Sequence, residues 1–467
     1  MSETIHQSLP FYFTKGLLLR TPALPFLPAP DQQTLTDLLN DQRFLEAIYM
    51  ASPVLYREAI RMKLGEITDT KEKNSILSSL VKYYQRMYSR STPFGLFSGC
   101  TVLQWNEKGD QVMIPVTAFR RSTRLDMHYC CALGQSIAAH PAVQERLLFY
   151  SNNSAYPIGE ELRYIEYRYQ SGKRVHQISS VAWSDYLKAV LDKAVNGVQL
   201  KELIALLIAE AAVETEEAET FIQDMVDAQV LIPETDPAIT GTDFIGQLLT
   251  VLQRINQPAH PDINQLIHQI TSLVASLGEA DQHFTNGADF YNGFQQAVQE
   301  LHVEFEEAKL LQVDMFSRPG QDQLSDHYQQ DLLKAATAMT RLFCQARNEN
   351  LDAFAEKFRK RYEDRSMPLL QVLDAETGIG YPEQSGSNLS PLVNELQLPA
   401  RTASGQTEIR WNQTEEWLFK KLLDASGKNE IEISLDELAE LEWKPELLPP
   451  SLSLMFSLVA DKRILIR

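Results

Sequence analysis

The pattern of residues 152–234 most limits how this chain can fold. Two strand-like segments, 162–169 and 174–179, flank a Gln-Ser-Gly-Lys turn, and the short apolar run Val230-Leu-Ile232 closes the unit. Three segments with helical periodicity lie between the second strand-like segment and this apolar run, near 183–195, 199–211 and 215–229. Strands, three helices and a terminal strand in about 80 residues are the order of a winged helix, which we predict here.

The third of these helices argues against a DNA-binding winged helix. Its segment from Glu214 to Asp227 is strongly acidic, whereas a recognition helix carries Arg, Lys, Asn or Gln toward base edges. Duplex DNA would be repelled. We therefore expect a protein or peptide partner and no DNA, and the edge of the sheet is a candidate for the addition of a partner strand.

The length of the chain predicts more than one structural unit. Its 467 residues exceed the size at which one hydrophobic core keeps growing. Strand-like and helical segments alternate on both sides of the winged-helix segment, so we predict an α+β fold of several subdomains. The predicted parts are residues 1–151, 152–234 and 235–467.

Composition indicates an ordinary folded protein of a reducing compartment. Apolar residues make up 44% of the chain and charged residues 22%, close to average globular usage. No signal peptide and no membrane-spanning apolar run is present, so we expect a soluble, cytoplasmic protein. The cysteines lack C-x-x-C spacing, which argues against a zinc site or a disulfide framework. They are Cys100, Cys130, Cys131 and Cys344.

The charge is unevenly distributed. The chain carries −19, yet residues 57–124 hold twelve Lys/Arg against six Asp/Glu, so this basic island is +6 and the remainder −25. Such an island is what a selective polyanion site would look like, because repulsion elsewhere disfavours nonspecific contact. Chance clustering on a solvated face is the alternative.

One predicted helix places cations on a single stripe. It starts near Thr70, a candidate N-cap, and Pro93 stops it. Lys82, Arg86 and Arg90 follow i, i+4, i+8 spacing, opposite an apolar arc. A bound anion would explain this cation stripe, and three solvated side chains covering apolar surface would explain it as well.

Two carboxylates interrupt apolar segments. Asp314 lies within Leu310 to Phe316, and Asp126 follows Arg124-Leu125. A carboxylate in such a place needs a partner. Each is explained by a capping or ion-pairing role, Asp126 as a helix N-cap especially. With the cation stripe they could also form one polar pocket.

Several catalytic classes lack their motifs. The chain has no Walker A sequence, no G-x-G-x-x-G after a strand, no H-E-x-x-H and no G-x-S-x-G. Its nine histidines are scattered without metal-ligand spacing. We therefore expect neither a metal nor another cofactor.

The segment from Lys82 to Gly99 resembles the class I lanthipeptide (lantibiotic) dehydratase family. It contains Arg90-Ser-Thr-Pro-Phe-Gly-Leu-Phe97, like the R-x-T-P-F-G-L-F run of that family. Shorter similarities extend over almost the whole chain, at Leu19-Arg20-Thr-Pro, Ala51-Ser-Pro-Val-Leu-Tyr56, Arg124-Leu-Asp126, Gln312-Val-Asp314, Thr377-Gly-Ile-Gly380 and Leu448-Pro-Pro-Ser. The resemblance implies the multi-subdomain fold of the N-terminal region of these dehydratases.

The resemblance implies an activity and a set of site residues. In that family the N-terminal region transfers glutamate from glutamyl-tRNA, a co-substrate, to Ser and Thr of a precursor peptide, and a separate domain eliminates it. A winged-helix element that recognises the leader peptide is embedded where residues 152–234 lie. Carried over by position, the glutamylation residues are Arg20, Lys82, Arg86, Arg90, Asp126 and Asp314.

The resemblance also leaves alternatives open. The Gly- and Ser-rich segment ending in Gly-Arg-Phe and the elimination domain are not matched here, so we expect roughly the first half of a glutamylation domain. The chain ends within the strand-like Arg463-Ile-Leu-Ile-Arg467, as a truncated chain or with a strand held in a sheet. A noncatalytic leader-binding module is one alternative, and addition of an amino acid to a peptide C-terminus is another. An elimination domain, a cyclase or a second copy of the chain are the further partners to expect.

Overall fold

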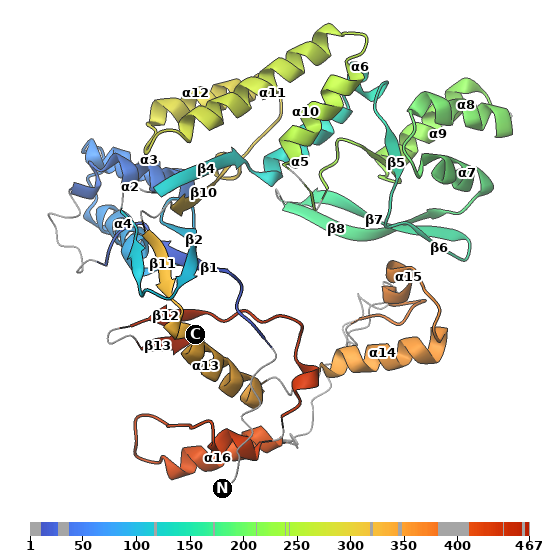
Figure 1. The fold of residues 1–467 in the computed structure, drawn as a ribbon. Coiled ribbons are helices and arrows are strands. Elements are labelled where there is room, and N and C mark those ends of the chain that lie inside the picture. Colours follow the sequence, from blue (N-terminus) through green and yellow to red (C-terminus); the bar gives the residue numbers. More distant parts are fainter. Residues whose placement is uncertain are drawn as a thin grey trace. The chain divides into compact units, whose positions relative to one another are not determined.

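The structure is a computed structural model that divides into two compact units, each described by itself (Figure 1). Unit 1 comprises Met1–Leu17, Gln104–Gln111 and Gln323–Arg467, and unit 2 comprises Leu18–Leu103 and Val112–Asp322. The structure describes residues 11–26, 37–115, 119–170, 173–211, 213–238, 240–241, 243–317, 321–343, 348–381, 411–441, 443–459 and 463–466.

The central sheet of unit 2 has one buried and one exposed face. β10 (Leu311–Ser317) pairs antiparallel with β4 (Phe119–Leu125) and parallel with β2 (Ser98–Asn106). β1 (Gly16–Pro22) also pairs with β2, and β3 (Gln111–Met113) is a short strand. Buried and exposed residues alternate strictly along β4, as expected for a sheet with one solvated face.

Three helices cover the buried face of this sheet. They are α2 (Gln42–Ala51), α3 (Pro53–Lys63) and α4 (Thr70–Ser89). Phe44, Leu80 and Met87 pack with Val313 and Met315 of β10 in one hydrophobic core. The predicted helix from Thr70 is thereby confirmed, but its N-cap is wrong by one residue. Asp69 is extended and its carboxylate accepts a hydrogen bond from the amide of Lys71, so Thr70 is already helical.

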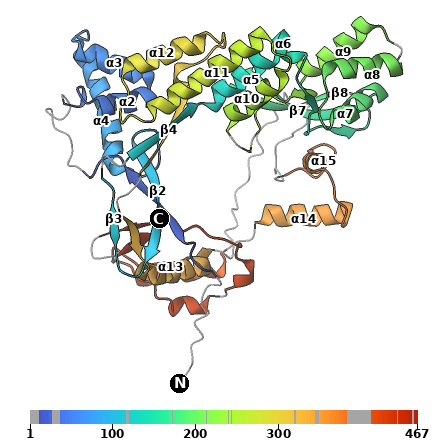
Figure 2. The same ribbon diagram turned by 45° about the horizontal axis from the view of Figure 1, so that its top comes forward.

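A second core of unit 2 is built mainly from helices. Figures 1 and 2 both show α11 and α12 side by side, and α10 packs against α5 and α11. Leu133, Leu252, Ile270 and Val298 are fully buried there. The helices are α5 (Met127–Ala138), α6 (Pro141–Gln144), α10 (Phe244–Ile255), α11 (Pro261–Ala280), α12 (Ala288–Gln299) and the 3-10 turn η2 (Glu307–Lys309).

The segment 152–234 contains the predicted order of elements. They are β6 (Tyr156–Ile158), β7 (Glu161–Gln170), β8 (Lys173–Ala182), α7 (Asp185–Ala194), α8 (Leu200–Ala211), α9 (Thr215–Asp227) and β9 (Leu231–Pro233). The terminal strand β9 pairs with β5 (Phe149–Ser151) and does not join the β6-β7-β8 sheet. Side chains of the segment share the second core with α5, α10 and α11, so they are buried against helices outside it.

Unit 1 is built mainly from helices. They are α13 (His327–Phe343), α14 (Glu349–Tyr362), α15 (Leu369–Leu373), α16 (Gln413–Asp424), and the 3-10 turns η3 (Glu437–Glu440) and η4 (Pro445–Leu447). β11 (Gln321–Ser325) pairs parallel with the end of β2. The predicted final strand is confirmed as β13 (Ile464–Ile466), which pairs antiparallel with β12 (Phe456–Leu458).

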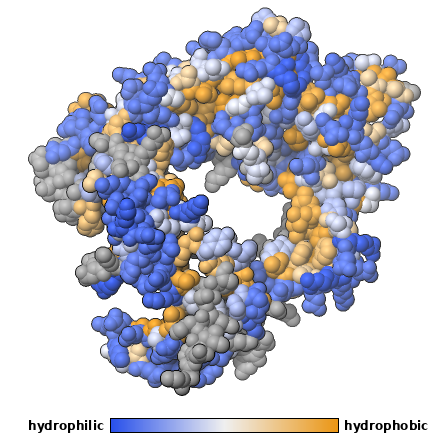
Figure 3. All heavy atoms as spheres, viewed as in Figure 1, coloured by the Kyte–Doolittle hydropathy of each residue, from blue (hydrophilic) through white to orange (hydrophobic). Residues whose placement is uncertain are grey.

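Unit 1 also exposes large apolar side chains. Figure 3 shows apolar atoms at the surface over α14 and α15, where Leu351 is 53% and Leu369 is 67% exposed. None of the described helices is both long and apolar enough to cross a membrane. Cys100, Cys130 and Cys131 are free thiols, and Cys344 lies outside the described residues.

The contact between β2 and β10 depends on Gly99. A Cβ at this position would lie 2.6 Å from the carbonyl oxygen of Met315. We expect Gly99→Ala to lower the free energy of unfolding in urea by about 1–3 kcal/mol, because the strands must separate locally. Gly278 in α11 has no atom within 4 Å of its built Cβ, so Gly278→Ala is the matched control and should not destabilise. Equal stability of the two variants would contradict this packing.

Candidate functional site

The cation stripe lies on the open side of α4. Lys82 and Arg90 are exposed and Arg86 is half-buried, whereas Leu80, Tyr84 and Met87 of the same helix are buried. The helix ends at Ser89, so Arg90 is its C-cap residue and has left the helical conformation. The predicted stripe therefore exists, with Arg90 at the point where the chain turns away.

The Thr-Pro-Phe-Gly turn folds back onto the stripe. The guanidinium carbon of Arg86 lies 4.3 Å from the centroid of the Phe94 ring, a cation–π contact. Phe94 in turn lies 5.7 Å from the ring of the fully buried Phe97. Gly95 has a φ of +48°, which an L side chain rarely adopts. The turn thus holds the Arg86 side chain in a defined place at the end of the helix.

Asp126 has the capping role that the sequence favoured. Its side chain accepts a hydrogen bond of 2.8 Å from the amide of His128, the second residue of α5. Its own amide donates to the carbonyl oxygen of Leu310 at 2.9 Å. Asp126 therefore fixes the start of α5 beside the strand that carries Asp314.

Asp314 lies on the exposed face of the sheet. Its neighbours Val313 and Met315 point into the core, so the Asp314 side chain points to the opposite face. Its carboxylate accepts a hydrogen bond of 2.6 Å from Arg124, a residue of β4 that was not among the predicted site residues. Arg20 is an exposed residue of β1.

The predicted site residues do not all contact one another directly. Among the described residues, no hydrogen bond or ion pair joins Asp126 or Asp314 to Lys82, Arg86 or Arg90. The carboxylates Asp126 and Asp314 have protein partners of their own, and the two ends of the predicted site lie on different elements, α4 and the β4–β10 pair. The structure therefore describes a cation stripe on α4 and two partnered carboxylates at the β4–β10 pair, with no direct bond between the two groups among the described residues.

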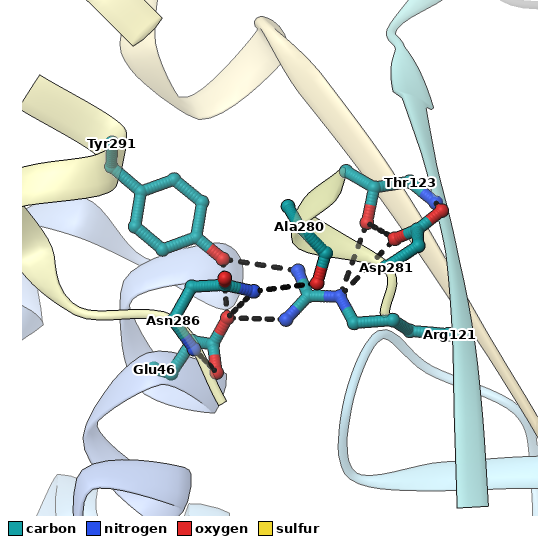
Figure 4. A network of polar contacts seen from close by, with 7 residues as sticks. All are labelled: Glu46, Arg121, Thr123, Ala280, Asp281, Asn286 and Tyr291. Atoms are coloured by element: carbon teal, nitrogen blue, oxygen red, sulfur yellow. Dashed lines mark hydrogen bonds and ion pairs between the residues drawn. The ribbon is translucent and has the colours of Figure 1, made fainter. Parts of the chain in front are cut away.

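Several arginines of the basic island are paired with carboxylates, so fewer cations are available to bind an anion than the net charge of the island suggests. Arg121 is buried, and its guanidinium pairs with the buried Glu46 and receives further contacts from Tyr291 and Asp281 (Figure 4). Arg57 and Arg61 pair with carboxylates. The sequence pattern does not identify these arginines as structural residues. In the fold, the strict alternation along β4 points Arg121 inward.

The buried network joins one strand to three helices. Arg121 of β4 donates to the Tyr291 hydroxyl of α12 at 3.0 Å, and the Thr123 amide donates to Asp281, next to α11, at 2.9 Å. The Asn286 amide donates to Glu46 of α2 at 3.0 Å. Burial alone would lower the pKa of Arg121, but Tyr291 and Glu46 outweigh it and raise that pKa.

The sheet of the segment 152–234 has one closed and one open edge. Beyond β6, side chains satisfy the backbone of β7: Asn152 donates to the Ile165 carbonyl at 3.0 Å, and the Gln229 amide exchanges two hydrogen bonds with Tyr167. No strand of the described chain pairs with the outer edge of β8. Val175 and Ile178 of β8 are 40% and 61% exposed.

A cavity of about 240 Å³ lies beside the closed edge. Residues of α5, α9 and β9 line it, together with Tyr167, Gln229 and Asp236. Burial raises the pKa of Asp236 although Arg174 and the Tyr167 hydroxyl oppose the shift.

Comparison with known proteins decides the family. Residues 40–464 match the family model described as lantibiotic dehydratase, N terminus. The chain belongs to this family. It is 23% identical over 361 residues to the subtilin biosynthesis protein SpaB of Bacillus subtilis, covering 75% of this chain and 33% of SpaB. It is 21% identical over 438 residues to the nisin biosynthesis protein NisB of Lactococcus lactis subsp. lactis, covering 89% of this chain and 40% of NisB.

Solved structures share the fold. The tRNA-dependent lantibiotic dehydratase MibB from Microbispora sp. 107891 matches with a TM-score of 0.78 and 21% identity over 98% of this chain and 44% of that chain. The TbtB glutamylation domain from thiomuracin biosynthesis matches with a TM-score of 0.58 and 16% identity over 93% of this chain and 53% of that one. This dehydratase-family chain spans only 33% to 40% of the length of SpaB and NisB.

The buried ion pair predicts a large difference between two substitutions. We expect Glu46→Gln to lower the free energy of unfolding in urea by about 3 kcal/mol or more, because it leaves the buried Arg121 without its main counter-charge. The Arg124–Asp314 pair has side chains that are 45% and 54% exposed. Arg124→Gln, the control, should therefore cost less than about 1 kcal/mol. Similar losses for both variants would be inconsistent with the burial described here.

Proposed function

We propose that this chain takes part in the tRNA-dependent glutamylation of Ser and Thr side chains in a ribosomally made precursor peptide, the first step of dehydration in lanthipeptide biosynthesis. The observation that carries the proposal is the cation stripe of α4, whose central Arg86 is held over Phe94 of the family motif. Membership of the dehydratase family supports it. So do the structural neighbours, one a tRNA-dependent dehydratase and the other a glutamylation domain.

The chemistry of this reaction suits the residues present. An aminoacyl ester is already activated, so its transfer to a hydroxyl exchanges one ester for another. The main requirements are to hold the polyanionic end of a tRNA and to align the peptide hydroxyl with the ester carbonyl. Lys82, Arg86 and Arg90 would bind phosphates. The TbtB glutamylation domain has also been solved with bound 5'-phosphodesmethylglutamycin.

We also propose that the segment 152–234 recognises the leader peptide. A leader would pair with the open edge of β8 by strand addition, where main-chain hydrogen bonds provide affinity and side-chain pockets provide specificity. The exposed Val175 and Ile178 would contact its apolar residues. Because this element lies within the described chain, a leader-binding module without its own catalytic activity is the second candidate function.

The first test removes the stripe. With precursor peptide and glutamyl-tRNA, we expect Arg86→Ala and Arg90→Ala each to reduce glutamylation about tenfold or more, because each loses a charge-assisted hydrogen bond to phosphate. Mass spectrometry of the peptide measures the modification. It also separates side-chain esters from addition at the peptide C-terminus.

The control is an exposed lysine of unit 1, Lys428. Lys428→Ala changes the net charge equally and should retain activity. Full activity of both stripe variants would refute the assignment of the stripe.

The second test addresses the leader. We expect Ile178→Asp to weaken the binding of a labelled leader peptide about tenfold or more, because it replaces the proposed apolar contact with the leader by a charge. Val274 of α11 is 42% exposed, so Val274→Asp is the matched control. Unchanged affinity of the Ile178 variant would exclude the β8 edge as the leader site.

A further inference from the structure

Four polar side chains lie in two neighbouring cross-strand pairs on the exposed face of β4 and β10. In the antiparallel register, Asp314 is directly opposite Ser122, and Gln312 is directly opposite Arg124. All four lie on the face away from the core, since Val313 and Thr123 between them are buried. We call these residues the strand quartet. Its members are close enough to act on one small ligand.

The ion pair inside the strand quartet is not explained by stability. Its two side chains are about half exposed, and pairs of this kind contribute little to folding. The pair also leaves some of its hydrogen-bonding groups without a described protein partner. Of the Asp314 carboxylate, only Oδ2 accepts a hydrogen bond from a described residue, and Arg124 donates only through one of its terminal nitrogens. A carboxylate oxygen and several guanidinium N–H groups therefore remain for a ligand.

The free groups match a ligand with two opposite charges. A guanidinium recognises a carboxylate with two parallel hydrogen bonds, and a carboxylate oxygen accepts from an ammonium. In a glutamyl ester the α-carboxyl is esterified, so the charges that remain are the α-ammonium and the side-chain carboxylate. The hydroxyl of Ser122 and the amide of Gln312 add neutral donors and acceptors beside these charges.

We propose that the strand quartet binds the glutamyl group of the aminoacyl ester. Arg124 binds the side-chain carboxylate and Asp314 binds the α-ammonium. This inference rests on the proposed glutamylation function and adds to it a residue, Arg124, that selects the amino acid. The neighbouring Arg120 does not share this role, since it lies opposite Phe316 and donates to the carbonyl oxygen of Phe119.

The test uses the full chain and three small probes. They are the α-methyl ester of L-glutamate, the α-methyl ester of L-glutamine, and the N-acetylated glutamate ester. The glutamine probe lacks the carboxylate and the acetylated probe lacks the ammonium. Ligand-observed NMR titration gives their relative affinities. We expect the wild-type chain to prefer the glutamate ester over each of the others about tenfold.

The variants separate the two charges. Arg124→Gln should lose the preference for glutamate over glutamine and keep the preference for a free amine. Asp314→Asn should do the reverse. Arg120→Gln, which removes a cation from the same face, should keep both preferences. A purely structural role would change all probes alike, so this crossed pattern identifies direct recognition. Unchanged midpoints of urea unfolding verify that the variants are folded.

Two outcomes overturn the inference: equal binding of the three probes by the wild-type chain, or both preferences retained in Arg124→Gln. Failure of the proposed function is seen separately, as an absence of glutamylated peptide in mass spectrometry. If the crossed pattern is found without peptide modification, the strand quartet stands as an amino-acid site and the glutamylation proposal fails. If the peptide is modified and Arg124→Gln still selects glutamyl-tRNA over glutaminyl-tRNA, only the strand quartet is wrong.

Discussion

The arrangement of unit 2 depends on one buried ion pair. The guanidinium of Arg121 and the carboxylate of Glu46 are almost completely removed from water, so neither charge can be left alone. Tyr291, Asp281 and Asn286 complete the hydrogen bonding and tie β4 to α2, α11 and α12. Because Arg121 is directed inward, the alternation of the strand directs Ser122 and Arg124 outward. The network therefore determines which side chains of β4 reach the exposed face.

The two sites follow from two different local constraints. On α4, the helical period places three cations on one stripe, and the turn at Phe94 and Gly95 brings a ring under the middle one. On the sheet, the period of two brings Asp314 and Arg124 together on adjacent strands. Both sites are carried by regular elements, which hold side chains more precisely than loops do.

Helix ends and caps near the site could be predicted from the local sequence pattern. The end of α4 after Ser89 follows from Pro93, and the capping role of Asp126 follows from its place before an apolar helix. What local pattern could not provide is pairing between distant segments. Arg124 and Asp314 are separated by 190 residues, and only the register of β4 with β10 makes them partners. The burial of Arg121 also depends on distant segments, α2 and α12. Local pattern therefore places Arg121 in the basic island, whereas in the fold it has a structural role.

We propose that the stripe on α4 binds tRNA through its phosphates. This binding is tested most directly by measuring the affinity of the chain for glutamyl-tRNA as a function of salt concentration. Each phosphate contact adds nearly one to the slope of log affinity against log salt. We expect Arg86→Ala and Arg90→Ala each to reduce the magnitude of this slope by about one. An unchanged slope in both variants would show that the stripe does not contact the nucleic acid.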